Sequence, residues 1–320
     1  MRAAGRRILA LITATVLVVA LSACTQRASE WGDGTAVIAG GGSTGVYFDY
    51  GSHLAAELTE MLGVRAAVEE TDGSVENLLQ VGGGEALLGF AQGDAAADAV
   101  AGVGVFDEPL PVRTVARLYD EYVHIVVRAD SEVEGIPDLA GKTVSLGAES
   151  SGVNVIARRV LDAAGVDVAS VRNPQLDLQE SIRAMEESDI DGFFWVGGLP
   201  TPGIQDLASD LPVRLLPVEQ EWVNAVNERY SDVYRTADFP AGTYGLTAPA
   251  PTMAVPNYLV TAESTPDAVV RDVLRTLFDA RSRIAVEVPA AALLNRRQAI
   301  FTAPVDLHPG AVEYYRETRR

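Results

Sequence analysis

Short apolar strands alternate with amphipathic helices along this chain, and loops of small residues join each strand to the helix that follows. In the first half, residues 35–39 have the pattern of a strand and residues 40–45 form a glycine-rich loop. Residues 46–62 carry apolar side chains at helical spacing, and Gly63 ends that helix. This alternation predicts an α/β fold with largely parallel sheets.

The same order of elements recurs in the second half of the chain. Residues 142–146 are predicted to form a strand and residues 147–152 a loop of small residues. Residues 153–164 then have the pattern of a helix, which Gly165 ends. A repeated unit of strand, loop and helix indicates two similar lobes.

Two segments also align residue by residue and support this repeat: GEALLGF at 84–90 and SDIDGFF at 188–194. We expect lobe I to comprise residues 35–127 and 256–320, and lobe II to comprise residues 128–255. The chain would then cross between the lobes twice, which makes a hinge. A cleft between two such lobes is a favoured place for a small molecule.

The N-terminus predicts export and a lipid anchor. Residues 1–23 combine three arginines with an uncharged apolar stretch too short for a comfortable membrane span, which indicates a signal peptide. Leu-Ser-Ala precedes Cys24, the only cysteine of the chain, and this tetrad is typical of a bacterial lipoprotein. We expect lipid on Cys24, a tether over residues 24–34, and a body held at the outer face of the cell membrane. The alternative is a chance thiol in an ordinary signal sequence.

Composition limits the classes of partner. Without residues 1–23 the chain has 297 residues, of which 22 are basic and 44 acidic, so its formal charge is about −22. Such a surface repels nucleic acid and anionic lipid headgroups. We therefore expect no nucleic-acid partner, and contact with the membrane only through the lipid.

A glycine-rich loop in the first half is a candidate ligand site. Its pattern, Gly40-x-Gly42-x-x-Gly45, matches a dinucleotide fingerprint weakly and lacks the lysine of a nucleotide P-loop. The loop amides and the hydroxyls of Ser43 and Thr44 suit a small anion at the N-terminus of the following helix. The alternative is that these two side chains only cap the helix.

A second loop, GAESSGVN at residues 147–154, repeats this arrangement. Ser150 and Ser151 precede a helix, and they are predicted either to donate to a carboxylate or to act as N-caps. Because both loops occupy equivalent places in the two lobes, a shared ligand between them is the favoured interpretation.

Residue groups that carry catalysis are scarce. His53, His124 and His308 lack the spacing of metal ligands, and Ser150 lies in no G-x-S-x-G motif. We therefore expect no enzyme activity, no metal and no cofactor.

Several motifs together resemble those of the TAXI-type solute receptors of TRAP (tripartite ATP-independent periplasmic) transporters. The resemblance covers residues 35 to 300 and rests on the order and spacing of the motifs. They are GGSTGVY at 41–47, DGSVENL at 72–78, AQGD at 91–94, LYDE at 118–121 with HIVV at 124–127, DLAGK at 138–142 and VGGLPTP at 196–202.

This resemblance implies a two-lobe, type II periplasmic-binding-protein-like fold and a function. The protein would be a monomeric receptor that binds a small anionic carboxylate, such as a glutamate-like amino acid, a dicarboxylate or a keto acid. It would deliver the solute to an ion-driven TRAP permease. By matching position, the implied ligand contacts are Gly42, Ser43, Thr44, Tyr47, Ser74, Asn77, Gln92 and Tyr119 in lobe I, and Ser150, Ser151, Asn154, Trp195 and Gly198 in lobe II.

The second loop departs from the family pattern, because Glu149 precedes Ser150 where small neutral residues are usual. Leu87 also stands where the family often has Asp. A carboxylate beside an anion site is unfavourable. Glu149 therefore either points to solvent or meets a cationic group of the ligand, which would favour an amino acid over a plain dicarboxylate.

Three other functions stay open from the sequence. The chain could be the solute receptor of an ABC importer, which shares the two-lobe architecture, or a sensor lobe that reports the solute to a membrane kinase. A secreted enzyme is the third, and turnover would reveal it.

Overall fold

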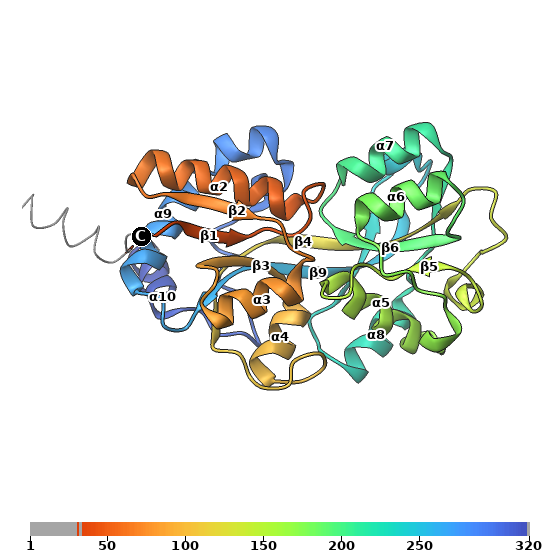
Figure 1. Cartoon of the computed structure of the whole chain (residues 1–320), viewed down its shortest axis with the longest axis horizontal. Coiled ribbons are helices and arrows are strands. Elements are labelled where there is room, and N and C mark those ends of the chain that lie inside the picture. Colours follow the sequence, from red (N-terminus) through yellow and green to blue (C-terminus); the bar gives the residue numbers. More distant parts are fainter. Residues whose placement is uncertain (1–30, 32–33, 319–320) are drawn as a thin grey trace, which may run out of the picture.

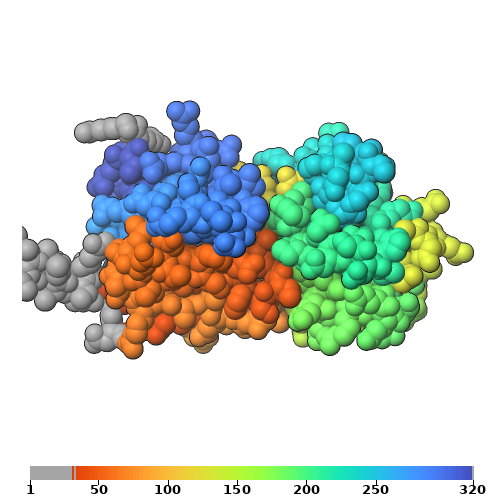
Figure 2. Space-filling model, turned by 90° about the horizontal axis from the view of Figure 1, so that it is seen from above, coloured from red at the N-terminus to blue at the C-terminus, as the bar shows by residue number. Residues whose placement is uncertain are grey.

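The computed structural model describes residue 31 and residues 34–318. The predicted signal peptide, Cys24 and most of the predicted tether lie outside the described residues. Figure 1 shows two lobes joined through two long strands, and Figure 2 shows the lobes side by side. In the part of the chain that the structure describes, no helix has the length and apolar character of a membrane span.

Lobe I contains the first elements of the chain and the last ones. The predicted helix after the glycine-rich loop is α2, with the expected bounds, and Gly63 ends it in a left-handed conformation (φ 70°). The elements are β1 (Ala36–Ala39), α2 (Val46–Leu62), β2 (Ala66–Glu69), α3 (Ser74–Gly83), β3 (Leu88–Gln92), α4 (Gly93–Ala101), α9 (Asp267–Glu287), η4 (Pro289–Leu293) and α10 (Pro309–Glu317).

Lobe II lies between the two long strands in the sequence. Its helix α5 follows the second small-residue loop, as predicted. The elements are η1 (Ile136–Leu139), β5 (Val144–Ser145), α5 (Gly152–Ala163), η2 (Val168–Ser170), α6 (Leu178–Glu186), β6 (Gly192–Gly197), α7 (Pro202–Asp210), β7 (Val213–Leu215), α8 (Gln220–Arg229), β8 (Arg235–Phe239) and η3 (Thr243–Gly245).

The long strands β4 (Val112–Arg128) and β9 (Ala250–Ala262) run antiparallel through both lobes and form the two crossings. The main strand order is β2-β1-β3-β9-β4-β6-β5, while β7 pairs with β4 and β8 with β9. Among the strands that the structure describes, only the β1–β2, β1–β3 and β5–β6 pairs are parallel. The expectation of largely parallel sheets is therefore wrong, because β4 and β9 traverse the hinge in opposite directions and impose antiparallel pairing on their neighbours.

The crossing in β4 lies slightly earlier than the sequence suggested. Residues 122–127 pair with β6 of lobe II, although the sequence assigned them to lobe I. Val123, Ile125 and Val127 are fully buried in the lobe II core with Ile156 of α5. Lobe I has a separate core around α2 and α9. Each lobe therefore buries its own apolar surface.

The internal repeat is visible in the backbone. Strands β3 and β6 begin at Leu88 and Gly192, which are paired in the sequence alignment. The aligned residues Gly84 and Ser188 follow α3 and α6, and both have positive φ angles, 79° and 64°. A left-handed residue ends each helix and turns the chain into the next strand. The two lobes therefore use the same local design at this point.

Candidate functional site

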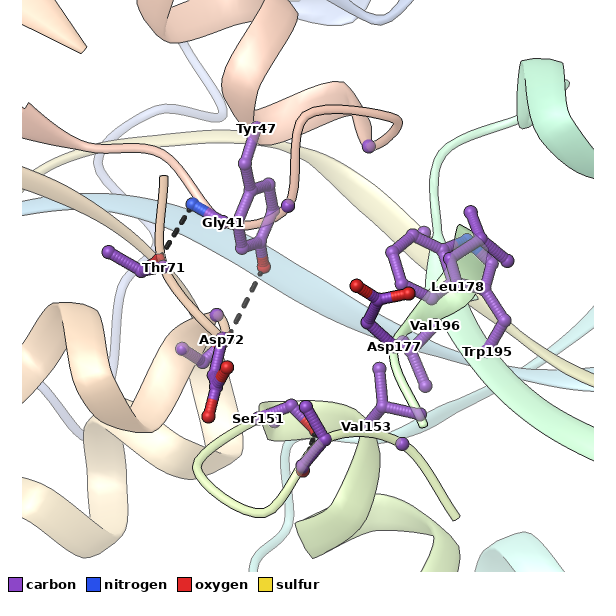
Figure 3. A pocket seen from close by; sticks show the side chains of 18 of the residues that line it. Gly41, Tyr47, Thr71, Asp72, Ser151, Val153, Asp177, Leu178, Trp195 and Val196 are labelled. Carbon is purple, nitrogen blue, oxygen red and sulfur yellow. Dashed lines mark hydrogen bonds between the residues drawn. The ribbon is translucent and has the colours of Figure 1, made fainter. Parts of the chain in front are cut away.

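A cavity of about 380 Å³ lies between the lobes, and loops of both lobes line it (Figure 3). Lobe I contributes residues 41–47, the loop 70–74, Glu76 and Gln92, with Glu121 from the crossing part of β4. Lobe II contributes residues 147–148, 151–153, 176–179 and 194–197. The predicted cleft between the lobes is therefore present.

The glycine-rich loop of lobe I is held by its neighbour loop. The amide of Gly41 donates to Thr71 Oγ1 at 2.8 Å, and the Thr71 hydroxyl donates to Asn77 Oδ1 at 2.5 Å. The amide of Ser43 donates to Glu70 Oε1 at 3.0 Å, and these bonds to Ser43 lower the pKa of Glu70. A carboxylate of the protein itself therefore occupies part of the site that the sequence suggested for an anion.

Helix α2 has no side-chain cap. Its N-cap is Gly45, which makes no side-chain hydrogen bond. Ser43 and Thr44 therefore do not act as N-caps here, and both line the cavity. Gly41 adopts a positive φ of 67°, which the turn into this loop requires.

Glu121 forms the buried floor of the cavity and is only 1 % exposed. Its Oε2 accepts from Gln92 Nε2 at 3.0 Å and from the Tyr47 hydroxyl at 3.1 Å. Its Oε1 accepts from the Tyr119 hydroxyl at 3.2 Å. Burial raises the pKa of Glu121 to about 8, and the three donors oppose that rise without cancelling it. The floor is thus a carboxyl group poised to change charge near neutral pH.

Gln92 has one polar atom without a partner. The side-chain oxygen Oε1 accepts no hydrogen bond, although Gln92 is only 2 % exposed and lines the cavity. The Gln92 backbone N–H donates to Ser74 Oγ at 3.1 Å. Because Nε2 is directed to the Glu121 carboxylate, Oε1 is left as a buried acceptor beside the lobe II loop.

In the second loop, the polar side chains of Ser151 and Asn154 form hydrogen bonds within lobe II. Ser151 is the N-cap of α5: its Oγ accepts from Asn154 N at 3.1 Å and donates to Ala148 O at 2.7 Å. Asn154 Oδ1 accepts from Arg158 Nε at 2.6 Å. Of the two predicted roles for Ser151, the structure therefore shows the N-cap. The Ser151 hydroxyl already has a donor and an acceptor partner.

The lobe II wall is largely apolar. In Figure 3 Val153, Leu178, Trp195 and Val196 lie opposite Tyr47 and the loop of Thr71 and Asp72. The indole N–H of Trp195 donates to Thr201 Oγ1 at 3.1 Å, so this polar atom is engaged within lobe II. The ring thus offers its apolar surface to the cavity.

Of the residues predicted to contact a ligand, eight line the cavity: Gly42, Ser43, Thr44, Tyr47, Ser74, Gln92, Ser151 and Trp195. The other five lie outside its lining: Asn77, Tyr119, Ser150, Asn154 and Gly198.

These five residues support the site from behind or at its edge. Asn77 orders the Thr71 loop, and Asn77 Nδ2 donates to Phe90 O at 2.8 Å. Tyr119 reaches the cavity only through Glu121. Ser150 O accepts from Glu76 N across the lobe boundary at 3.2 Å. Asn154 is bonded within its own helix and loop, and a side chain at Gly198 would meet Tyr119.

Sequence reasoning missed the acidic lining of the cavity. Five carboxylates line it: Glu70, Asp72, Glu76, Glu121 and Asp177. No Lys, Arg or His of the described residues does so. Glu121 ends the LYDE motif, two residues after Tyr119, shortly before the predicted crossing between the lobes. That position could have indicated a carboxyl group at the cleft. Glu149, which the sequence singled out instead, is exposed and lies outside the lining.

A buried ion-pair cluster joins the lobes outside the cavity lining. Arg159 of α5 pairs with Asp94 of α4 at 3.1 Å and with Asp98 of the same helix. The Tyr234 hydroxyl donates to Asp94 Oδ2 at 2.6 Å. Burial raises the pKa of Asp98 despite the opposing effect of Arg159. The buried Arg159 of lobe II is thus paired with lobe I, outside the cavity lining.

Comparisons with known proteins agree with this architecture. The model of the NMT1-like family matches residues 38–318. Among solved structures, PhnD1 from Prochlorococcus marinus in complex with methylphosphonate is 10% identical (TM-score 0.52, covering 88% of this chain and 97% of that chain). An ancestral arginine-binding protein bound to arginine is 13% identical (TM-score 0.52, 79% and 97%). A putative L-cystine ABC transporter from Listeria monocytogenes is 11% identical (TM-score 0.51, 82% and 98%).

These likenesses confirm the predicted fold class, a two-lobe α/β fold of the type II periplasmic-binding-protein kind. The family match covers nearly all of the described residues. The chain therefore belongs to the NMT1-like family.

Proposed function

We propose that the protein is an extracytoplasmic receptor that captures a small solute between its lobes and hands it to a membrane transporter. The cavity carries this proposal, because loops of both lobes enclose about 380 Å³ on either side of a two-strand hinge. Enclosed clefts of this size between lobes suit small molecules.

The transporter class is the next part of the proposal. A structural neighbour described as a putative L-cystine ABC transporter supports the ABC importer alternative. Delivery to a TRAP permease rests on the resemblance of sequence motifs to the TAXI receptors alone. The ABC alternative is therefore the better supported of the two. A sensor lobe would bind its solute in the same way, and loss of uptake on deletion separates the two roles.

We further propose that a lipid on Cys24 holds the receptor at the outer membrane face. This rests on the sequence pattern before Cys24. A Cys24→Ser protein is expected to be released or left unprocessed, as measured by fractionation, and to bind solute as tightly as the parent. A Cys24→Ser protein that still labels with lipid contradicts the anchor.

The test of solute capture is a thermal-shift screen of the purified protein, freed of bound small molecules, against amines, amino acids, dicarboxylates, keto acids and sugars. A solute at 100 times its Kd adds about 2.7 kcal/mol to the free energy of unfolding. A shift that saturates with one solute class is expected. No shift with any class contradicts the receptor proposal.

A further inference from the structure

The charge of the cavity lining is the starting point. Five acidic side chains line the cavity, whereas Lys, Arg and His of the described residues are absent from its lining. Three of these carboxylates, Glu70, Asp72 and Asp177, are exposed at the edge, whereas Glu121 is buried at the floor. An anion that enters this cavity meets like charge from both lobes.

The unpaired side-chain oxygen of Gln92 independently favours a solute that donates a hydrogen bond. Gln92 Oε1 is buried, lines the cavity and has no partner among the described residues. Leaving such an acceptor unpaired is unfavourable, so its natural complement is an N–H or O–H group. A carboxylate group carries only acceptors, so a solute without another polar group that donates cannot fill this role.

Glu121 lies beside that acceptor and receives neutral donors only. Gln92 Nε2, Tyr47 and Tyr119 supply them, and no Lys, Arg or His of the described residues bonds to this carboxyl. An ammonium group placed here would lower the pKa of Glu121 and hold it as a carboxylate, so that this carboxylate and the Gln92 amide oxygen both accept from the N–H donors.

The opposite wall indicates what the rest of the solute is like. Val153, Leu178 and Trp195 present apolar surface from lobe II, and the Trp195 indole N–H is already bonded to Thr201. A solute with a short apolar body would bury that surface when the lobes meet.

We infer that the cavity takes a solute with a protonated amine or guanidinium, no net negative charge and a short apolar body. The cationic head would lie at Glu121 and Gln92, and the body would lie against Trp195. This inference rests on the proposed receptor function, and it competes with the carboxylate that the motif resemblance implies.

Two matched sets of probes test the charge. The first is 1,5-diaminopentane, 5-aminopentanoate and glutarate, which share one five-carbon frame. The second is 2-phenylethylamine and 3-phenylpropionate. Calorimetric titration of the ligand-free full chain is expected to give at least ten-fold tighter binding for each amine than for the matched acid, with the zwitterion between them.

The variants Glu121→Gln and Gln92→Leu test the head position. Each is expected to weaken binding of the amines at least five-fold. Glu149→Gln is the matched control, because it makes the same substitution at an exposed position outside the lining. It is expected to leave amine binding unchanged. Circular dichroism and the unfolding midpoint show whether each variant is folded.

The outcomes separate this inference from the receptor proposal. Tighter binding of glutarate or 3-phenylpropionate than of the amines overturns the amine assignment and leaves solute capture intact. Equal loss of amine binding in Glu149→Gln and Glu121→Gln also overturns it, since the effect is then one of overall charge. If no probe binds while another solute class of the thermal-shift screen does, the assignment is wrong and the receptor proposal stands. No binding by any class overturns both.

Discussion

The two loops that face each other across the cavity have the same place in the repeat but different chemistry. The lobe I loop has a glycine N-cap without a side-chain bond, and its backbone is held by Thr71 and Glu70 of the neighbouring loop. The lobe II loop has Ser151 as its cap and satisfies its polar groups internally. The repeat therefore conserves backbone design, whereas the side chains around each loop decide what it offers to a solute.

The same contrast holds for the two walls. Lobe I and the crossing strand supply Glu70, Asp72, Glu76, Glu121 and Gln92, while lobe II supplies mostly apolar surface with Asp177 at its edge. The buried arginine of lobe II pairs with two aspartates of lobe I outside the cavity lining. A solute would thus find polar acceptors on one side and a hydrophobic wall on the other.

The largest expected effect comes from breaking the ion-pair cluster that holds the two walls together. Arg159→Leu would leave Asp94 and Asp98 buried without their cation. Removal of one partner of a buried pair costs about 3–5 kcal/mol, so the free energy of unfolding should fall by this amount in urea denaturation. Solute affinity should fall as well, because the lobes lose a contact.

The control for this prediction is Arg229→Leu. Arg229 pairs with Asp162 within lobe II at 2.8 Å, and both side chains are about half exposed. Its loss should cost less than about 1 kcal/mol. Equal costs for the two variants would show that the Arg159 cluster does not link the lobes energetically.

The next effect concerns the acid at the cavity floor. Burial raises the pKa of Glu121 from 4.5 to about 8, with Tyr47, Tyr119 and Asp94 as the other titratable groups around it. The folded protein therefore retains a proton that the unfolded chain loses. The stabilisation is complete below pH 4.5 and is lost as pH rises through 8, by up to about 1.4 kcal/mol per pH unit.

Comparing Glu121→Gln with the parent in urea unfolding between pH 6 and 8.5 checks this prediction. The parent should lose stability with rising pH relative to the variant. Because His124 is retained in both proteins, its own titration cancels from the difference. Parallel pH profiles would mean that Glu121 is ionised at neutral pH already.

A third change tests whether the two loops must meet for binding. A side chain at Gly152 would place Cβ 2.1 Å from Gln92 Oε1 and 2.7 Å from Ser74 Oγ. Gly152→Ala should therefore hold the lobes apart and weaken solute binding about ten-fold in a calorimetric titration, with little loss of stability. Gly83→Ala is the control, since nothing lies within 4 Å of its added Cβ. Unchanged affinity in Gly152→Ala would show that the loops can separate without cost.

The smallest effect separates capping from ligand contact in the second loop. Ser151→Ala removes the cap of α5 and should lower the free energy of unfolding by about 1 kcal/mol. Solute affinity should change less than two-fold, because the Ser151 hydroxyl is already bonded to Ala148 and Asn154. A large loss of affinity at unchanged stability would instead make Ser151 a ligand donor.

Local patterns predicted much of the fold. Helical spacing gave α2 its observed bounds, and β3 and β6 begin at residues that are paired in the aligned segments. The antiparallel pairing around β4 and β9 was not predicted, because strand direction depends on partners far away in the sequence. The acidic excess of the chain was evident from composition, but composition does not say which carboxylates line a cavity.

The sequence by itself determined the elements, the repeat and the two-lobe architecture, because these follow from periodicity and from residues that end helices. Tertiary structure alone decided the character of the site. It brought Glu121 of the crossing strand beneath Gln92 and Tyr47, and left Glu149 in solvent. The physical reason is that burial and partner geometry, which fix the charge and hydrogen bonding of a side chain, arise only when distant segments pack together.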